Sequence, residues 1–174
     1  MDLKKKIKDH MDFPKKGILF RDINPVFRDS AALESISKSF VDEMEAKDID
    51  LIAGIESRGF VVATALANRN KKGVLMIRKV GKLPGKTLKR KYDIEYGEAI
   101  MEIQEDAIRP GQRVIIADDL IATGGTALAA AELVEQLGGR VVFFAFVIDL
   151  VHLSGSQKLK EKGYEVRSLV NYHE

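Results

Sequence analysis

The sequence has no cysteine, no tryptophan and only 4 prolines in 174 residues. Without cysteine, the chain has no disulfide, thiolate nucleophile or cysteine-ligated zinc, and it suits a reducing compartment. Long hydrophobic runs are also missing, because the longest, residues 141–148, is too short to cross a bilayer. The first lysines are followed by no apolar stretch, so we expect no signal peptide. These absences predict a cytoplasmic protein with no membrane partner.

The charges nearly balance, with 28 basic and 26 acidic residues and a net charge of +2. This balance argues against a general nucleic-acid-binding protein. The distribution is uneven, however, because residues 71–91 are rich in lysine and arginine and contain no acidic residue. Such a segment is either a solvated loop or a basic surface that binds a polyanion, which would be a phosphorylated small molecule or a nucleic acid.

Hydrophobic periodicity predicts alternating strands and helices in a chain whose length fits one domain. We expect helices at residues 31–47 (with Ser30 as N-cap), 59–68, 127–137 and 156–162. We expect strands at residues 51–55, 73–77, 114–117, 141–148 and 164–170. The short apolar run at residues 51–55, which ends in polar residues, is typical of a buried parallel strand. The prediction is an α/β fold, a doubly wound and mainly parallel sheet flanked by helices.

Two segments interrupt this alternation. Residues 1–30 contain Pro14, Gly17 and Pro25 and indicate turns rather than a long regular element. Residues 81–97 have no clean apolar period, and a loop of that length in a compact domain is usually functional, often a lid. Apolar residues then alternate from Ala99 to Ile103, which predicts a strand after the loop, in an antiparallel flap.

The most informative motif is residues 114–126, VIIADDLIATGGT. An apolar strand leads to Asp118 and Asp119, and a turn of small residues then opens into a helix. The turn consists of Ala122, Thr123, Gly124, Gly125 and Thr126.

Ligands of open α/β sheets bind at the carboxyl edge of the strands. Free N–H groups at a helix start favour a phosphate, whereas adjacent carboxylates suit a ribose diol or Mg²⁺. The motif therefore predicts a pocket for a ribose 5-phosphate. A strand–turn–helix unit whose glycines serve packing alone is the alternative. The nucleoside-triphosphate and dinucleotide fingerprints are both missing from the sequence.

Residues 114–126 resemble the phosphoribosyl-pyrophosphate signature of the type I phosphoribosyltransferases. Residues 13–25, FPKKGILFRDINP, resemble the purine-side segment of the members that use adenine, and residues 54–60, GIESRGF, resemble their pyrophosphate loop. Residues 78–79, 82–85 and 95–97 resemble their flexible loop. The resemblance implies the type I phosphoribosyltransferase fold in one domain, residues 1–174, with a base-binding hood at 1–30 and a flexible catalytic loop at 81–97.

The resemblance also implies a reaction in purine salvage. The 5-phosphoribosyl group would pass from phosphoribosyl pyrophosphate to adenine, giving AMP and pyrophosphate. Mg²⁺ would be bound through the substrate, with oxygens of Asp118 and Asp119 as additional ligands, rather than held mainly by the protein. The enzyme would be a cytoplasmic homodimer with no nucleic-acid partner.

Individual residues acquire roles from the same resemblance. Asp118 and Asp119 would bind the ribose hydroxyls, and the turn at 122–126 would bind the 5-phosphate. Phe20 would stack on adenine while the backbone of Leu19 and Arg21 reads the edge of the base. Pyrophosphate would be bound by Arg58, Arg78, Lys79 and Lys82.

Within the flexible loop, Glu95 would be the acid/base for the purine, with Tyr96 as its neighbour. A cis peptide is expected between Glu56 and Ser57. His152 departs from the family, which commonly has an acidic residue there, so this wall of the base pocket stays undefined. The histidines at 10, 152 and 173 lack ligand spacing, and we expect no protein-bound zinc.

Two other functions remain open on the sequence. One is an enzyme of the same family that uses hypoxanthine or xanthine, although residues 13–25 disfavour it. The other is a non-catalytic regulator that senses phosphoribosyl pyrophosphate and binds nucleic acid through its basic segment. Such regulators generally need an added DNA-binding module.

Overall fold

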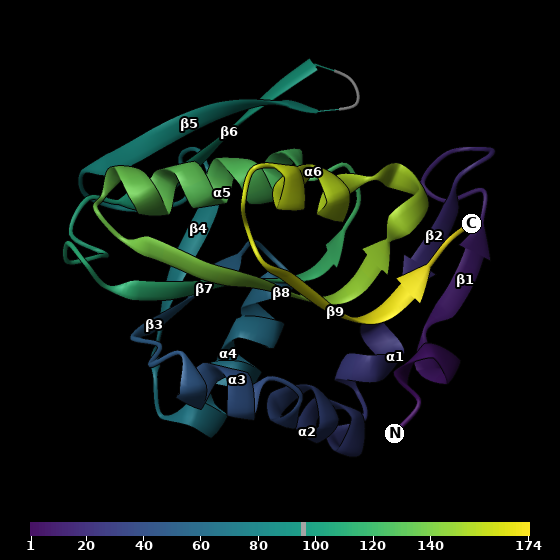
Figure 1. Cartoon of the computed structure of the whole chain (residues 1–174). Helices are drawn as coiled ribbons and strands as arrows, with labels where there is room; N and C mark the ends of the chain where they lie inside the picture. Colours follow the sequence, from purple (N-terminus) through teal and green to yellow (C-terminus); the bar gives the residue numbers. More distant parts are fainter. Residues whose placement is uncertain (95–96) are drawn as a thin grey trace.

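The structure is a computed structural model that describes residues 1–94 and 97–174. In the described part, a seven-stranded sheet forms the centre and a two-stranded sheet, β1–β2, lies to one side (Figure 1). The strands are β1 Lys8–Met11, β2 Leu19–Asp22, β3 Leu51–Ile55, β4 Gly73–Lys79, β5 Thr87–Ile94, β6 Gly97–Gln104, β7 Arg113–Ile121, β8 Arg140–Leu150 and β9 Val166–Tyr172. The α-helices are α1 Asn24–Phe27, α2 Ser30–Lys38, α3 Val41–Ala46, α4 Gly59–Asn70, α5 Gly125–Gln136 and α6 Gly155–Glu161. Two 3₁₀ turns complete the chain, η1 Leu3–Lys6 and η2 Val151–Leu153.

The large sheet has the order β5-β6-β4-β3-β7-β8-β9. Strands β4, β3, β7, β8 and β9 are parallel, whereas β6 pairs antiparallel with both β4 and β5. This arrangement confirms the predicted α/β fold with a mainly parallel sheet. It also brings the carboxyl ends of β3 and β7, which carry the predicted motifs, to one edge.

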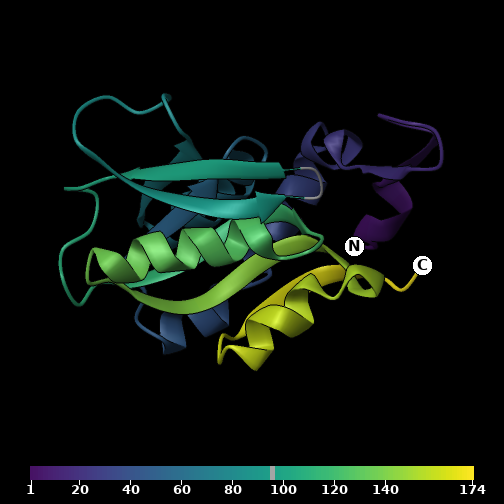
Figure 2. The same ribbon diagram turned by 90° about the horizontal axis from the view of Figure 1, so that it is seen from above.

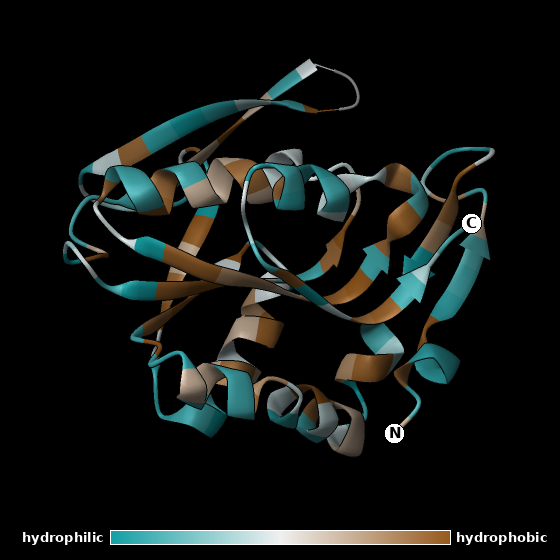
Figure 3. Cartoon of the chain, in the orientation of Figure 1, coloured by the Kyte–Doolittle hydropathy of each residue, from teal (hydrophilic) through white to brown (hydrophobic). Residues whose placement is uncertain are grey.

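Helices cover both faces of this sheet (Figure 1). Helices α2, α3 and α4 lie on one face, and α5 and α6 lie on the other. Because successive side chains of a strand point to opposite faces, Ile115 and Ala117 of β7 join the first core and Val114 and Ile116 join the second. The apolar colouring of the central strands in Figure 3 reflects this two-sided burial.

The first predicted helix is wrong in two respects. Residues 31–47 form two helices, α2 and α3, and the N-cap of α2 is Asp29 rather than Ser30. The carboxylate of Asp29 accepts a hydrogen bond of 2.9 Å from the N–H of Ala32. Phe40 separates the helices with a non-helical φ of −122°, and its buried ring packs in the same core as Ile36 and Met44. The break therefore brings all three apolar side chains to one core.

The two irregular segments contain more structure than expected. Strands β1 and β2 form an antiparallel hairpin within the N-terminal 30 residues. Residues 81–97 were expected to be a loop, yet residues 87–94 form β5, which pairs with β6 and runs along α5 (Figure 2). The predicted antiparallel strand after residue 97 is confirmed as β6. No helix in the described part is long and apolar enough to span a membrane.

Candidate functional site

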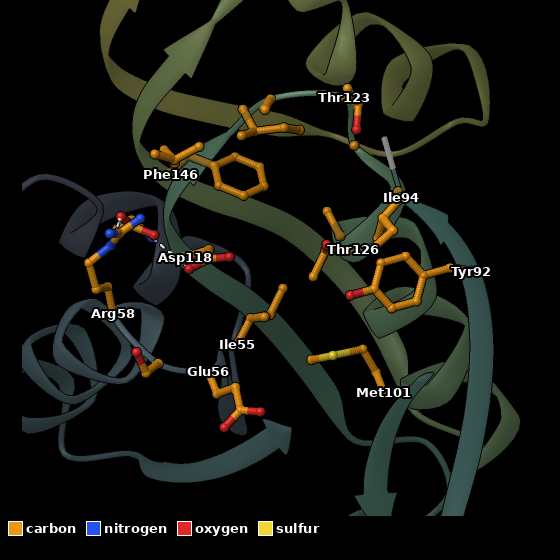
Figure 4. Close-up of a pocket in the computed structure, with 18 of the residues that line it drawn as sticks. Ile55, Glu56, Arg58, Tyr92, Ile94, Met101, Asp118, Thr123, Thr126 and Phe146 are labelled. Carbon is orange, nitrogen blue, oxygen red and sulfur yellow. Dashed lines mark hydrogen bonds and ion pairs between the residues drawn. The ribbon is translucent and has the colours of Figure 1, made fainter. Parts of the chain in front are cut away.

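A cavity of about 810 Å³ opens at the carboxyl ends of β3 and β7 (Figure 4). Strands β5 and β6 form its opposite wall. Most of the predicted phosphate and pyrophosphate residues line it, namely Arg58, Lys79, Lys82, Asp118, Asp119 and residues 122–126. The structure thus brings together residues that are more than 60 positions apart in the sequence (58 and 119).

The predicted phosphate turn leads directly into α5. Gly124 is the N-cap of the helix with a φ of +84°, a left-handed conformation that favours glycine. Because glycine has no side chain, an anion can approach the backbone closely at this position. The N–H groups of the first helical turn have no acceptor within the helix and can bind such an anion. Helix α5 begins at Gly125, two residues earlier than predicted, so the anion-binding helix start falls inside the motif.

Gly155, at the start of α6, packs against this turn and was missed by the sequence analysis. Its N–H donates a 3.0 Å hydrogen bond to the carbonyl oxygen of Ala122. A Cβ at position 155 would lie 2.2 Å from that oxygen, so only glycine fits there without moving the turn. The sequence carries only a weak signal for this contact, a glycine just before a predicted helix.

The two adjacent acids differ in their surroundings. Asp119 is 5% exposed, and its Oδ2 accepts a 2.6 Å hydrogen bond from Nε of Arg58. Asp118 is half-buried, and its Oδ1 accepts from the N–H of Asp119 at 2.8 Å. Burial, and then the neighbouring charge of Asp119, raise the pKa of Asp118 well above its ordinary value. A hydroxyl donor or a cation in the cavity would therefore stabilise the charged form of Asp118 more than that of Asp119, which is already paired with Arg58.

Glu56 binds two residues at the end of β4, the side chain of Arg78 and the backbone of Lys79. Its Oε2 lies 3.0 Å from Nη2 of Arg78, and its Oε1 accepts a 2.5 Å hydrogen bond from the N–H of Lys79. Arg78 also donates to the carbonyl oxygen of Lys82 at 3.3 Å. Lys79 and Lys82 line the cavity, whereas Arg78, which was also predicted to bind pyrophosphate, is not among the lining residues and pairs with Glu56. The expected cis peptide between Glu56 and Ser57 is present.

Glu102 of β6 is a second anchoring carboxylate that the sequence analysis missed. It is 2% exposed and accepts hydrogen bonds from the N–H groups of Lys82 and Leu83, both at 2.9 Å, and from the hydroxyl of Thr87 at 3.1 Å. Burial alone would raise the pKa of Glu102. The hydrogen bonds that it accepts from the segment between β4 and β5 and from Thr87 outweigh burial and lower the pKa. The apolar alternation of this strand placed Glu102 on the polar side and gave no sign of its burial.

The predicted base-binding residues lie on the β1–β2 hairpin beside the cavity. The ring of Phe20 is 5.0 Å from that of Phe13, edge to face, and 5.6 Å from the guanidinium of Arg58. Arg58 therefore connects the hairpin to Asp119 in the cavity. Leu19 is partly exposed, and the side chain of Arg21 contacts Tyr172 at the C-terminal end of the sheet.

The wall opposite Asp118 comes from residues that the sequence did not single out. Tyr92, Ile94 and Met101 of the β5–β6 hairpin line the cavity (Figure 4). The predicted Glu95 and Tyr96 lie outside the described residues. Within residues 1–94 and 97–174, no group of three or more His, Cys, Asp or Glu side chains is arranged to hold a metal ion.

Comparison with known proteins gives consistent results for sequence and structure. Residues 29–172 match the model of the phosphoribosyl transferase domain family. The chain is 55% identical over 172 residues to the adenine phosphoribosyltransferase of Nitrosopumilus maritimus, covering 99% of this chain and 100% of that protein.

Two solved structures share the fold over nearly the whole chain. The adenine phosphoribosyltransferase of Thermoanaerobacter pseudethanolicus matches with a TM-score of 0.93 and 45% identity, covering 98% of both chains. The enzyme from Saccharomyces cerevisiae, solved with adenine and an imino-altritol bisphosphate, matches with a TM-score of 0.90 and 42% identity, covering 97% of this chain and 96% of that one.

Proposed function

The chain belongs to the phosphoribosyl transferase domain family, and we propose that it transfers the 5-phosphoribosyl group from phosphoribosyl pyrophosphate to adenine. The products are AMP and pyrophosphate, and the reaction belongs to purine salvage. The observation that carries this proposal is the cavity in which Asp118, Asp119 and the glycine turn of α5 face the cationic side chains of Arg58, Lys79 and Lys82.

Each part of phosphoribosyl pyrophosphate has a complementary part of the cavity. The 5-phosphate binds at the start of α5, where the turn offers backbone N–H groups and the hydroxyls of Thr123 and Thr126. The ribose diol donates hydrogen bonds to Asp118 and Asp119. The pyrophosphate lies near Arg58, Lys79 and Lys82, with Arg78 held behind them by Glu56. These cations stabilise the charge that develops on pyrophosphate as it leaves.

Adenine binds on the hairpin side of the cavity. Phe20 offers an aromatic face, and the neighbouring guanidinium of Arg58 fixes the position of its ring. The backbone of Leu19 and Arg21 reads the edge of the base, and Glu95 exchanges the proton of the purine. Residues 81–97 act as the flexible catalytic segment, which excludes water from an oxocarbenium-like centre.

The reaction uses Mg²⁺, which is bound mainly through the substrate. The donor set fits this arrangement, because Asp119 is engaged by Arg58 and leaves Asp118 as the acid with the most to gain from a cation. Mg²⁺ keeps few protein ligands and prefers oxygen. When bound, it neutralises part of the pyrophosphate charge.

The enzyme functions as a homodimer of single-domain chains in the cytoplasm. Exposed apolar side chains support the dimer, namely Val61 on α4, Val74 and Met76 on β4, and Val80 just after β4. The lack of cysteine suits the reducing conditions of the cytoplasm.

Pyrophosphate release from phosphoribosyl pyrophosphate, measured with each purine base in turn, tests the proposal. We expect release with adenine and far less with hypoxanthine, guanine or xanthine. A double variant, Asp118→Asn with Asp119→Asn, keeps the volume of both side chains but removes their charge, and should lower kcat/KM by about 10²-fold or more.

Two outcomes would contradict the proposal. Preferred release with hypoxanthine or xanthine would place the protein in another branch of the family. Salt-sensitive binding of duplex DNA without any pyrophosphate release would favour the regulator.

A further inference from the structure

The β1–β2 hairpin has little core of its own. All four residues of β1 are exposed, and those of β2 are exposed or half-buried. A two-stranded hairpin is marginally stable in water unless it packs against something else. Since this hairpin carries Phe20, whatever fixes it to the rest of the molecule also fixes the base-binding ring.

The side chain of Arg21 provides such an attachment. It is 9% exposed, and Nη1 lies 2.5 Å from Oδ2 of Asp9, the residue opposite it in the hairpin. Nη2 donates a 2.9 Å hydrogen bond to a main-chain oxygen of Glu174, two residues after β9. The planar guanidinium also lies over the ring of Tyr172, 4.0 Å from its centroid. One side chain therefore joins both hairpin strands to the C-terminal segment.

Tyr172 is itself fixed by the core of the protein. It is 7% exposed and belongs to the core on the α2–α4 face of the sheet. It ends β9, the edge strand of the large sheet. Lys4 of η1 lies over the same ring at 4.6 Å and donates to the carbonyl oxygen of Asn171 at 3.4 Å. The ring thus receives two cations from separate N-terminal elements.

Neighbouring side chains of a strand point in opposite directions, so Phe20 and Arg21 leave β2 on opposite faces. The face with Arg21 is bound to the C-terminal segment, and the face with Phe20 is turned toward Arg58 at 5.6 Å. Fixing the first face therefore sets the distance between Phe20 and the cavity.

We propose that residues 172–174 position the base-binding hairpin, and that Arg21 is the positioning residue that transmits their effect to Phe20. This inference rests on the proposed function, because it assigns a consequence to adenine binding. It adds a role for the side chain of Arg21, of which the proposed function uses only the backbone, and a role for residues 172–174.

Steady-state kinetics with both substrates varied separately will test the inference. Tyr172→Leu removes the cation–π contact, and Arg21→Lys removes the planar fork that binds Asp9 and Glu174 at once, so each should raise KM for adenine by about tenfold. KM for phosphoribosyl pyrophosphate and kcat should change less than about twofold, because the phosphate turn lies on other elements. Removal of residues 173–174 deletes the main-chain oxygen that accepts from Arg21 and should raise KM for adenine in the same selective way.

Two conservative variants separate positioning from general stability. Tyr172→Phe keeps the ring under both cations and should restore the KM for adenine that Tyr172→Leu loses. Arg28→Lys makes the same exchange as Arg21→Lys at an exposed position just after α1 and should leave both KM values unchanged.

Equal changes in the KM of both substrates, or no change in any of the variants, would overturn the inference. If Tyr172→Leu does not fold, Arg21→Lys and the truncation decide the question. Failure of the proposed function would look different, because the unaltered protein would then not consume adenine.

Discussion

Asp118 shows how one residue can favour ligand binding at the expense of the folded state. Its carboxyl is half-buried, and burial together with Asp119 raises its pKa well above the ordinary value of 3.8. Between the ordinary and the raised pKa, the folded protein holds a proton that the unfolded chain has released. The free energy of unfolding therefore falls as pH rises through that window, and the penalty is fully present above the raised pKa.

We predict that Asp118→Asn stabilises the protein while it impairs turnover. The amide has the size of the carboxyl but no charge. At neutral pH the variant therefore does not lose the free energy of unfolding that a partly buried charge costs the unaltered protein. We expect a rise in Tm of about 2–4 °C, which corresponds to about 1 kcal/mol in a protein of this length. Thermal unfolding across a pH series measures the difference in Tm between the variant and the unaltered protein. This difference should vanish as pH falls toward 3.8.

Asp106→Asn makes the same change at an exposed position and should alter Tm by less than about 1 °C. A destabilised Asp118→Asn, or a gain in Tm that is equal at all pH values, would show that the carboxyl is not strained by its surroundings.

At the scale of elements, the connection from β4 to β5 depends on the strand beside it. Glu102 of β6 binds the N–H groups of Lys82 and Leu83 and the hydroxyl of Thr87. This carboxylate therefore fixes a turn that would otherwise have no buried partner, and with it the position of Lys82 in the cavity. The lowered pKa of Glu102 keeps it charged, so this contribution is lost only as pH falls below the ordinary value of 4.5.

We predict that Glu102→Leu raises KM for phosphoribosyl pyrophosphate by about tenfold and lowers the free energy of unfolding by about 1–3 kcal/mol, because it leaves two partly buried N–H groups unpaired. Glu102→Gln keeps an acceptor for both N–H groups and should show a smaller effect on each quantity. Substrate kinetics and denaturant unfolding measure them.

Glu98→Gln is the matched control, since Glu98 lies on the same strand but is exposed and pairs with Lys91 at the surface. It should leave both KM and stability unchanged. If Glu102→Leu loses stability without any change in KM, the connection does not position Lys82.

The same elements show which structure a single sequence can predict. Strands β3, β7 and β8 were found because each contains a continuous apolar run that is buried on both faces of the sheet. Strand β4 was also found from its apolar run, although Val74 and Met76 on it are exposed. Strand β5 was missed because its outer residues are polar and its contacts are distant in sequence, such as the ion pair of Arg90 with Glu132 of α5 at 2.5 Å. The β1–β2 hairpin was missed for the same reason, because it depends on the end of the chain.

In the candidate site, the residues of local motifs could be predicted from the sequence, whereas residues that hold these motifs from distant parts of the chain could not. The acids and the glycine turn are contiguous in the sequence, and the structure places them in one cavity. Gly155 and Glu102 act on backbone that is 19 or more residues away, Gly155 through a close approach and Glu102 through hydrogen bonds. No periodicity or spacing records such contacts, so they emerge only from the fold.

At the scale of the whole molecule, the exposed apolar side chains on α4 and β4 predict self-association. Val61 of α4, Val74 and Met76 of β4, and Val80 just after β4 are between 37% and 48% exposed, and the two elements are neighbours. Exposed apolar residues that are grouped in this way mark interfaces more often than isolated ones do. In a two-fold dimer the same surface meets itself, so one substitution changes both sides of the contact.

We predict that Met76→Glu dissociates the dimer. An unpaired charge in a dry interface costs about 3 kcal/mol, which raises the dissociation constant by about 10²-fold. Sedimentation velocity at several protein concentrations measures the shift. Met11→Glu is the matched control, because Met11 is 65% exposed but lies on the β1–β2 hairpin, and its variant should remain dimeric. Dissociation by Met11→Glu alone would move the interface to the hairpin, and a protein that is monomeric without any substitution would show that α4 and β4 meet no second copy.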